Sequence, residues 1–203
     1  PANEESGFAP GDHYQESKAE GERVVIEYMH DKRLPIVVFR PAGIYGPGDL
    51  RFLKLFKSIK ARRFVMIGSG EVRNQLIYID DLIDGIILCA TNESAPGNVY
   101  ILAGNEPATL TQLVHMIAQV LDVQPTRLRV PFTPVYLAGF ICEMICKPLG
   151  LDPLLHRRRV NFFSNMRWFD ISKAKEQLGF KPKIDFRTGL DRTARWYQKQ
   201  GFL

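Results

Sequence analysis

The amino-acid sequence predicts an α/β fold built around a parallel sheet. In residues 14–32, apolar side chains recur at the spacing of one face of a helix. Residues 36–39 are four consecutive apolar strand formers, a pattern typical of a strand buried on both faces of a parallel sheet. Beyond them, predicted strands and helices alternate to the last residues, which is the element order of α/β architecture.

The other elements follow from the same patterns and from local end signals. Residues 40–49 are rich in proline and glycine, which favours a loop. Thr109 and Gln112 form a capping box at the start of one helix, and Gly179 is typical of the residue that follows another. We expect helices at residues 50–61, 80–91, 109–121, 134–146, 170–178 and 188–200, strands at 64–67, 76–79 and 99–102, and an extended segment at 127–131.

The most apolar stretch of the sequence is residues 134–146. It contains one charged residue, Glu143, and is shorter than the roughly 20 apolar residues that a helix needs to cross a bilayer. We expect a buried helix there, with contact to a membrane surface as the alternative. The three cysteines form no zinc-binding or disulfide pattern, so we expect structural thiols in a reducing cytoplasm and no metal site: Cys89, Cys142 and Cys146.

The charge of the chain favours small anionic ligands. The 203 residues include 27 Lys and Arg against 22 Asp and Glu, a formal net charge of +5. Such a balance attracts nucleotides and phosphorylated molecules. Most basic residues are scattered among acidic ones, and we expect neither a nucleic-acid nor a membrane partner. The one dense basic run, residues 156–159, either binds phosphates or forms a solvated helix face or turn.

The sharpest chemical pattern is Tyr14 followed four residues later by Lys18. Residues four apart share a helix face, so the phenol and the ammonium can lie side by side. A neighbouring cation stabilises the phenolate form, and such a tyrosine can exchange a proton with a substrate alcohol. The lysine can also bind the hydroxyls of a ribose. Taken alone, this spacing is more typical of a surface pair on an ordinary helix.

Further motifs follow the Tyr-x-x-x-Lys segment in a fixed order. Together with residues 14–22 (YQESKAEGE), they resemble the extended short-chain dehydrogenase/reductases, also called the NAD-dependent epimerase/dehydratase family. The resemblance runs from Tyr14 to the C-terminus, and only residues 122–160 match poorly. The motifs are residues 40–49 (RPAGIYGPGD), 68–70 (GSG), 77–82 (IYIDDL), 169–174 (FDISKA), 178–182 (LGFKP) and 196–197 (WY).

The resemblance implies the C-terminal part of a Rossmann-type doubly wound parallel sheet, plus a small α/β substrate-binding lobe. Residues 1–105 would belong to the NAD(P)-binding domain, and residues 106–203 mainly to the substrate-binding lobe and C-terminal helices. Asp81 would support the local fold. Tyr14 would be the catalytic acid/base and would also contact the cofactor. Lys18 would be its partner and a ligand of the nicotinamide ribose. The loop against the nicotinamide would be formed by Pro41, Ala42, Gly43 and Ile44.

Other family features are absent from the sequence. It has no Gly-x-x-Gly-x-x-Gly turn for the cofactor phosphates, and the family's catalytic Ser or Thr lies further upstream than Pro1. We therefore expect a C-terminal portion that is inactive alone, with NAD or NADP as the cofactor of the intact protein. In that protein we expect a homodimer formed through the helix at residues 14–32. A non-catalytic binding protein of the same family is the alternative.

The expected substrate is a small molecule, and a nucleotide-activated sugar is our first choice. Cationic side chains available for a diphosphate favour it, but Gly43 and Asn74 stand where such enzymes often carry Asn and Arg. The alternative is a 3β-hydroxysteroid or sterol alcohol, because residues 40–47 and the apolar helix resemble that branch. The candidate substrate-binding residues are Arg73, Asn74, Arg159 and Arg167.

Overall fold

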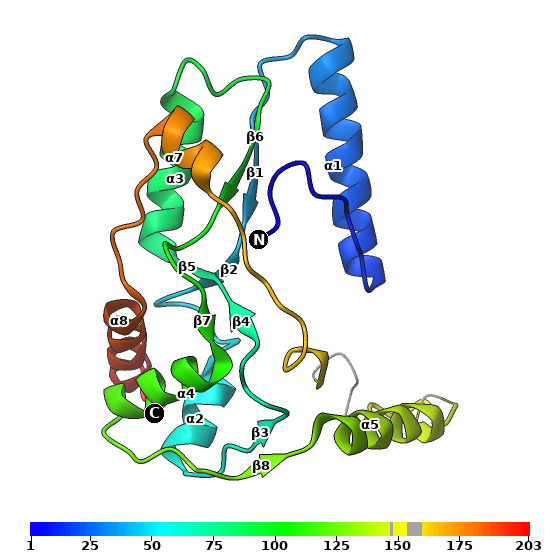
Figure 1. The fold of residues 1–203 in the computed structure, drawn as a ribbon, viewed down its shortest axis with the longest axis vertical. Coiled ribbons are helices and arrows are strands. Elements are labelled where there is room, and N and C mark those ends of the chain that lie inside the picture. Colours follow the sequence, from blue (N-terminus) through cyan, green and yellow to red (C-terminus); the bar gives the residue numbers. More distant parts are fainter. Residues whose placement is uncertain (147, 154–159) are drawn as a thin grey trace. The chain divides into compact units, whose positions relative to one another are not determined.

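The computed structural model describes residues 1–146, 148–153 and 160–203, and Figure 1 shows their helices and strands. The chain forms two compact units, and each is assembled from three separate stretches of sequence. Unit 1 comprises Pro1–Tyr45, Gln75–Glu106 and Trp168–Asp185, and unit 2 comprises Gly46–Asn74, Pro107–Arg167 and Phe186–Leu203. The functional division at residue 105 stays a prediction.

Unit 1 contains two pairs of parallel strands. Strand β1 pairs with β6, and β2 pairs with β5. In Figure 1, helices α1 and α3 lie on opposite sides of the β1–β6 pair. The elements are α1 (His13–Asp31), β1 (Val38–Pro41), β2 (Gly43–Tyr45), β5 (Leu76–Tyr78), α3 (Ile79–Thr91), β6 (Val99–Leu102) and α7 (Ser172–Leu178).

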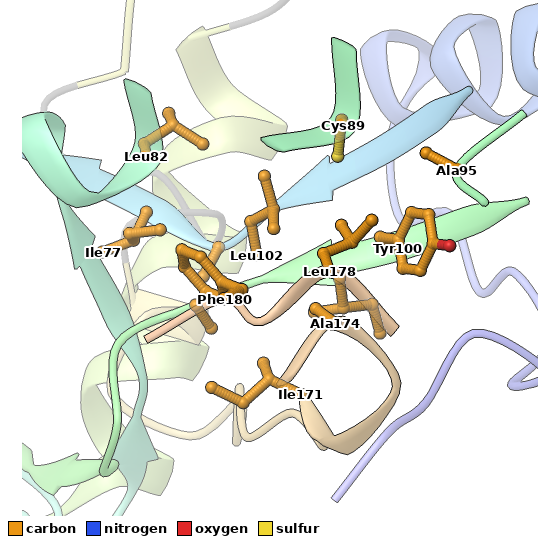
Figure 2. Packing of buried hydrophobic residues seen from close by; sticks show 13 residues of the cluster. Ile77, Leu82, Cys89, Ala95, Tyr100, Leu102, Ile171, Ala174, Leu178 and Phe180 are labelled. Carbon is orange, nitrogen blue, oxygen red and sulfur yellow. The ribbon is translucent and has the colours of Figure 1, made fainter. Parts of the chain in front are cut away.

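The core of unit 1 forms where α3 and α7 cover β6. Figure 2 shows Tyr100 and Leu102 of β6 among the buried side chains of this cluster, with Phe180 beside Leu102. Gly85 lets α3 approach the strand, since a Cβ atom there would lie 3.0 Å from both Leu102 and Phe180. Gly179 ends α7 with a φ of 67°, a left-handed conformation that glycine adopts without strain.

Unit 2 packs its core around α4, which contacts α2 and α8. The rings of Phe56 and Tyr197 meet edge to face, with 5.2 Å between their centroids. Strand β3 pairs with β8 in parallel, and β4 pairs with β7 antiparallel. The elements are α2 (Leu53–Lys60), β3 (Met66–Ile67), β4 (Arg73–Asn74), β7 (Ala108–Thr109), α4 (Leu110–Val120), β8 (Arg129–Val130), α5 (Phe132–Cys146) and α8 (Phe186–Lys199).

Most predicted elements are confirmed to within a few residues. The capping box of α4 has both of its hydrogen bonds. The backbone N–H of Gln112 donates to the Thr109 hydroxyl, and the backbone N–H of Thr109 donates to the Gln112 side chain. Strand β6 has the predicted bounds. The two-residue strands β4 and β7 were not predicted, because a pair of residues carries no periodic pattern.

Two predictions about the first strand were wrong. Its residues are half-buried or exposed rather than buried on both faces, because β6 is the one strand paired with β1 among the described residues. The proline- and glycine-rich segment is a loop only from Gly46. Its first part continues from β1 into β2, since the N–H of Ala42 donates to the carbonyl of Leu102 and β2 pairs with β5.

The prediction of a buried helix at residues 134–146 was also wrong. On α5 the buried residues are Gly139 and Glu143, whereas the large apolar side chains are mostly exposed. Cys142 and Cys146 share a face with 3.9 Å between their sulfur atoms, but they are half-buried, and Cys89 is buried. No helix in the described part of the chain is long and apolar enough to cross a membrane.

Candidate active site

The N-terminus of α1 places the two predicted catalytic residues. Asp12 caps the helix, because its Oδ1 accepts a hydrogen bond of 2.9 Å from the N–H of Gln15. The cap fixes where the helix begins, at His13. Tyr14 therefore lies in the first turn, and Lys18 lies one turn later on the same face.

Tyr14 and Lys18 are brought together at the surface of unit 1. The Nζ atom of Lys18 lies 5.8 Å from the centroid of the Tyr14 ring, within the range of a cation–π contact. Tyr14 is 64% exposed. Both side chains line a surface cavity of about 260 Å³, together with Phe8 and Gln15. The phenol can therefore meet a ligand from outside, with a cation beside it.

Arg40 of β1 connects α1 to the sheet through an ion pair with Glu22. Its Nη2 lies 2.7 Å from Oε1 of Glu22, and both side chains are largely buried. Its Nη1 also donates to the carbonyl of Glu4 at 2.9 Å, and its guanidinium lies 5.0 Å from the Phe8 ring centroid. Sequence analysis missed this anchor, because the partners are 18 or more residues away along the chain.

The segment predicted to meet the nicotinamide begins at Pro41, the carboxyl end of β1, and ligands bind at this edge of the sheet in open α/β folds. Pro41 and Gly43 are exposed, Ile44 is half-buried and Ala42 is buried. A Cβ atom on Gly43 would lie 2.7 Å from Cδ2 of Leu76, so glycine permits the close pairing of β2 with β5. This segment thus presents backbone rather than bulky side chains.

Asp81 supports the fold of unit 1, as the family resemblance implied. It is buried, and its carboxylate accepts hydrogen bonds from the N–H groups of Lys183 (2.9 Å) and Ile184 (3.0 Å). Burial, and next the charge of Asp81, raises the pKa of Tyr45 far above its usual value. Tyr45 therefore keeps its proton, and it has no part in our assignment of the acid/base.

The predicted substrate residues of unit 2 also meet. The backbone of Arg167 pairs with that of Asn74 in an isolated parallel β-bridge. The backbone N–H of Arg167 donates to the carbonyl of Arg73 at 2.9 Å. Arg73 and Arg167 are exposed, whereas Asn74 is only 3% exposed. The Nδ2 of Asn74 has no hydrogen-bond partner among the residues that the structure describes. Arg159, with the rest of the basic run at 156–159, lies outside the described residues.

Gln75 is a buried polar residue that sequence analysis missed. Its Oε1 accepts a hydrogen bond of 2.8 Å from the N–H of Phe169, and its Nε2 donates to the carbonyl of Gly104. It thereby joins three stretches of unit 1 that are far apart in sequence. A polar side chain directly before the apolar strand β5 was the available signal.

The family of the chain follows from direct comparison. Residues 1–103 match the model of the NAD dependent epimerase/dehydratase family. The chain belongs to this family, and the resemblance read from its motifs is confirmed.

Three relatives with different names match the chain over most of its length. It is 32% identical to the uncharacterized protein y4nL of Sinorhizobium fredii, over 98% of this chain and 57% of that protein. It is 29% identical to a sterol-4-alpha-carboxylate 3-dehydrogenase of Candida albicans, over 91% of this chain and 56% of that protein. It is 27% identical to a UDP-glucose 4-epimerase of Vibrio cholerae, over 96% and 56%. The chain thus spans about half the length of the curated relatives it matches.

Solved structures confirm the predicted fold class. The crystal structure of gox2253 matches with a TM-score of 0.79 at 22% identity, covering 100% of this chain and 62% of that one. UDP-glucuronic acid 4-epimerase from Bacillus cereus, solved with NAD, matches with a TM-score of 0.74 at 21% identity, covering 98% and 56%. The chain therefore has the α/β fold of a portion of a Rossmann-type epimerase/dehydratase.

Proposed function

We propose that this chain supplies the acid/base residues of an NAD(P)-dependent epimerase, dehydratase or reductase. The enzyme would act on a carbon that alternates between hydroxyl and keto forms. The observation that carries the proposal is the Tyr14–Lys18 pair, exposed at a surface cavity in a chain of the epimerase/dehydratase family. Because the chain spans about half of its relatives, the activity is proposed for the protein that contains it.

Tyr14 would hold and release the proton at the substrate oxygen. Its phenol donates that proton when a keto group is reduced and takes it back when the alcohol is oxidised. Lys18 would be the partner of Tyr14, since its ammonium lies 5.8 Å from the centroid of the ring. NAD or NADP, when bound, supplies the hydride chemistry.

The residues present fit such a cofactor. Lys18 offers an exposed ammonium that can donate to ribose hydroxyls, and Gly43 adds no side chain to an exposed stretch of backbone. We propose that Lys18 and the segment formed by Pro41, Ala42, Gly43 and Ile44 hold the nicotinamide end. The Rossmann part of the sheet, residues 1–105, would then be the cofactor side of the protein.

Replacing Tyr14 with Phe in the full-length protein tests the assignment. We expect kcat to fall about 100-fold or more, because the proton-transfer group is lost. Binding of NADH, followed by its fluorescence, should survive. Tyr28→Phe is the matched control, because Tyr28 is an exposed tyrosine on the same helix and should leave kcat unchanged. Equal turnover in Tyr14→Phe and wild-type protein would overturn the assignment of Tyr14, whereas binding of NADH without any turnover in the wild type would favour the non-catalytic binding protein.

For the substrate, we propose a nucleotide-activated sugar first. Arg73 and Arg167 are both exposed, and the backbone N–H of Arg167 donates to the carbonyl of Arg73, next to the buried Asn74. Guanidinium groups bind diphosphates through charge-assisted hydrogen bonds. UDP-glucose should then be turned over in the same assay, and Tyr14→Phe should abolish that turnover.

A sterol or steroid alcohol is the second candidate. Asn74 and Gly43 stand at positions where the sugar-nucleotide enzymes often carry Arg and Asn, and a sterol needs no diphosphate contact. The Candida albicans relative is named as a dehydrogenase of sterol carboxylates. Turnover of a 3β-hydroxysteroid and none of UDP-glucose would establish this alternative.

The assembly and location of the protein are also proposals. Helix α1 exposes Val24 and Val25, and such a face fits the homodimer that we propose. The described cysteines are free thiols, which fits a reducing cytoplasm.

A further inference from the structure

Helix α5 has its apolar side chains outside and its charge inside. Leu137, Ile141, Met144 and Ile145 are between 45% and 61% exposed, and we call these four residues the α5 face. The helix has one charged residue, Glu143, which is buried together with Gly139. This is the reverse of a helix that packs against a protein core and meets water with polar residues.

The α5 face is continuous along the helix. Its members are spaced by four, three and one residues, so they fall on one side of a helix with 3.6 residues per turn. Leu128 precedes the helix, Leu149 and Leu151 follow it, and all three are also exposed. Exposed apolar surface of this kind marks a site of contact with another apolar phase or molecule.

The stretch of sequence that contains α5 is basic. Residues 127–167 contain seven Lys and Arg against two Asp and Glu, a net charge of +5 that equals the charge of the whole chain. The remainder of the sequence therefore has a net charge of zero. Arg127 and Arg129, which directly precede α5, are exposed. An exposed apolar helix face preceded by exposed arginines, in a basic stretch of sequence, is complementary to an anionic lipid surface.

We propose that the α5 face docks the protein on an anionic membrane surface. A helix of 15 residues is about 22 Å long at 1.5 Å per residue, shorter than the roughly 30 Å hydrocarbon core, so it would lie in the plane of the interface. Glu143, on the inward side, would stay out of the lipid. This replaces our expectation of no membrane partner, and it is independent of the substrate.

Vesicle co-sedimentation of the full-length protein tests the docking. We expect it to pellet with vesicles of phosphatidylcholine and phosphatidylglycerol, and much less with phosphatidylcholine alone. Added salt should weaken the binding, because the lipid charge is then screened. The double variant Ile141→Ser/Ile145→Ser should lower the vesicle partition coefficient at least about tenfold, since it removes apolar groups from the docking face.

The matched control is Ile83→Ser/Ile87→Ser. These isoleucines are also four residues apart on a helix, α3, and their exposures of 48% and 53% resemble those of Ile141 and Ile145. The control should bind vesicles like the wild type, and circular dichroism should show both variants folded.

Two results would overturn the proposal. One is equal pelleting with both kinds of vesicle, or equal binding by the two double variants. The other is a wild-type protein that does not bind vesicles, combined with an oligomeric state that changes in Ile141→Ser/Ile145→Ser and not in Ile83→Ser/Ile87→Ser. That second result would mean that another copy of the protein covers the α5 face.

Discussion

Helices α4 and α5 belong to the same unit and are both rich in apolar residues, yet they bury opposite kinds of side chain. The buried residues of α4 include Leu113 and Ile117, and its exposed residues include Gln112 and Gln119. On α5, by contrast, the buried residues are Gly139 and Glu143, and the apolar side chains point outward.

The difference shows that apolar content does not decide which face of a helix is buried. Helix α4 has neighbours on two sides, α2 and α8, and its apolar face fills the space between them. Helix α5 turns its smallest and its charged residue inward. Its apolar residues therefore add little to the stability of unit 2 and remain available for binding.

The largest expected effect is a difference in the loss of stability between alanine variants of α4 and α5. Ile117→Ala should lower the free energy of unfolding by about 4 kcal/mol, because Ile117 is fully buried and its removal leaves a cavity. Ile141→Ala should change it by about 0.5 kcal/mol or less, because that side chain is half in water already. Urea unfolding measures both. Equal losses would mean that the α5 face is covered by protein in solution.

A second pair of variants extends the comparison to α3, where two acids differ in burial. Asp81 is buried and binds two backbone N–H groups, whereas Asp84 is partly exposed and lies 2.7 Å from Nζ of Lys183. Asp81→Ala should cost about 3 kcal/mol of unfolding free energy, because two buried donors lose a charged acceptor. Asp84→Ala, the matched control, should cost about 0.5 kcal/mol. A larger loss for Asp84→Ala would contradict this ranking.

What could be predicted from the sequence was local. The capping box of Thr109 and the left-handed Gly179 depend on neighbours within a few residues, and both are confirmed. The pairing of Tyr14 with Lys18 follows from helix geometry in the same way, and the structure brings the two side chains together. Their catalytic role stays a proposal.

What could not be predicted depends on distant parts of the chain. The contact of Asn74 with Arg167 joins residues 93 positions apart, and no pattern in either segment indicates it. The buried role of Gln75 depends on Gly104 and Phe169 in the same way. The wrong prediction for α5 has this origin too, because its apolar residues were assigned to a core without knowledge of which neighbours the helix has.

The smallest expected effect concerns α8, on the well-packed side of α4. Tyr197 is fully buried, and its hydroxyl donates to the carbonyl of Asp49. Burial, and next the charge of Asp49, raises the pKa of Tyr197 from 10.0 to about 12. A folded-state pKa above the unfolded value means that the stabilisation is complete below about pH 10 and is lost as the pH rises through about 12.

Tyr197→Phe should therefore act in two ways. At neutral pH it should lower the free energy of unfolding by about 1 kcal/mol, the typical value of one buried hydrogen bond. Between about pH 10 and 12 it should flatten the decline in stability seen for the wild type, because the titrating phenol is gone. Urea unfolding at several pH values measures both effects. If the variant and the wild type lost stability at the same rate over that range, the Tyr197 hydroxyl would titrate alike in the folded and unfolded chain, and burial in α8 would not raise its pKa.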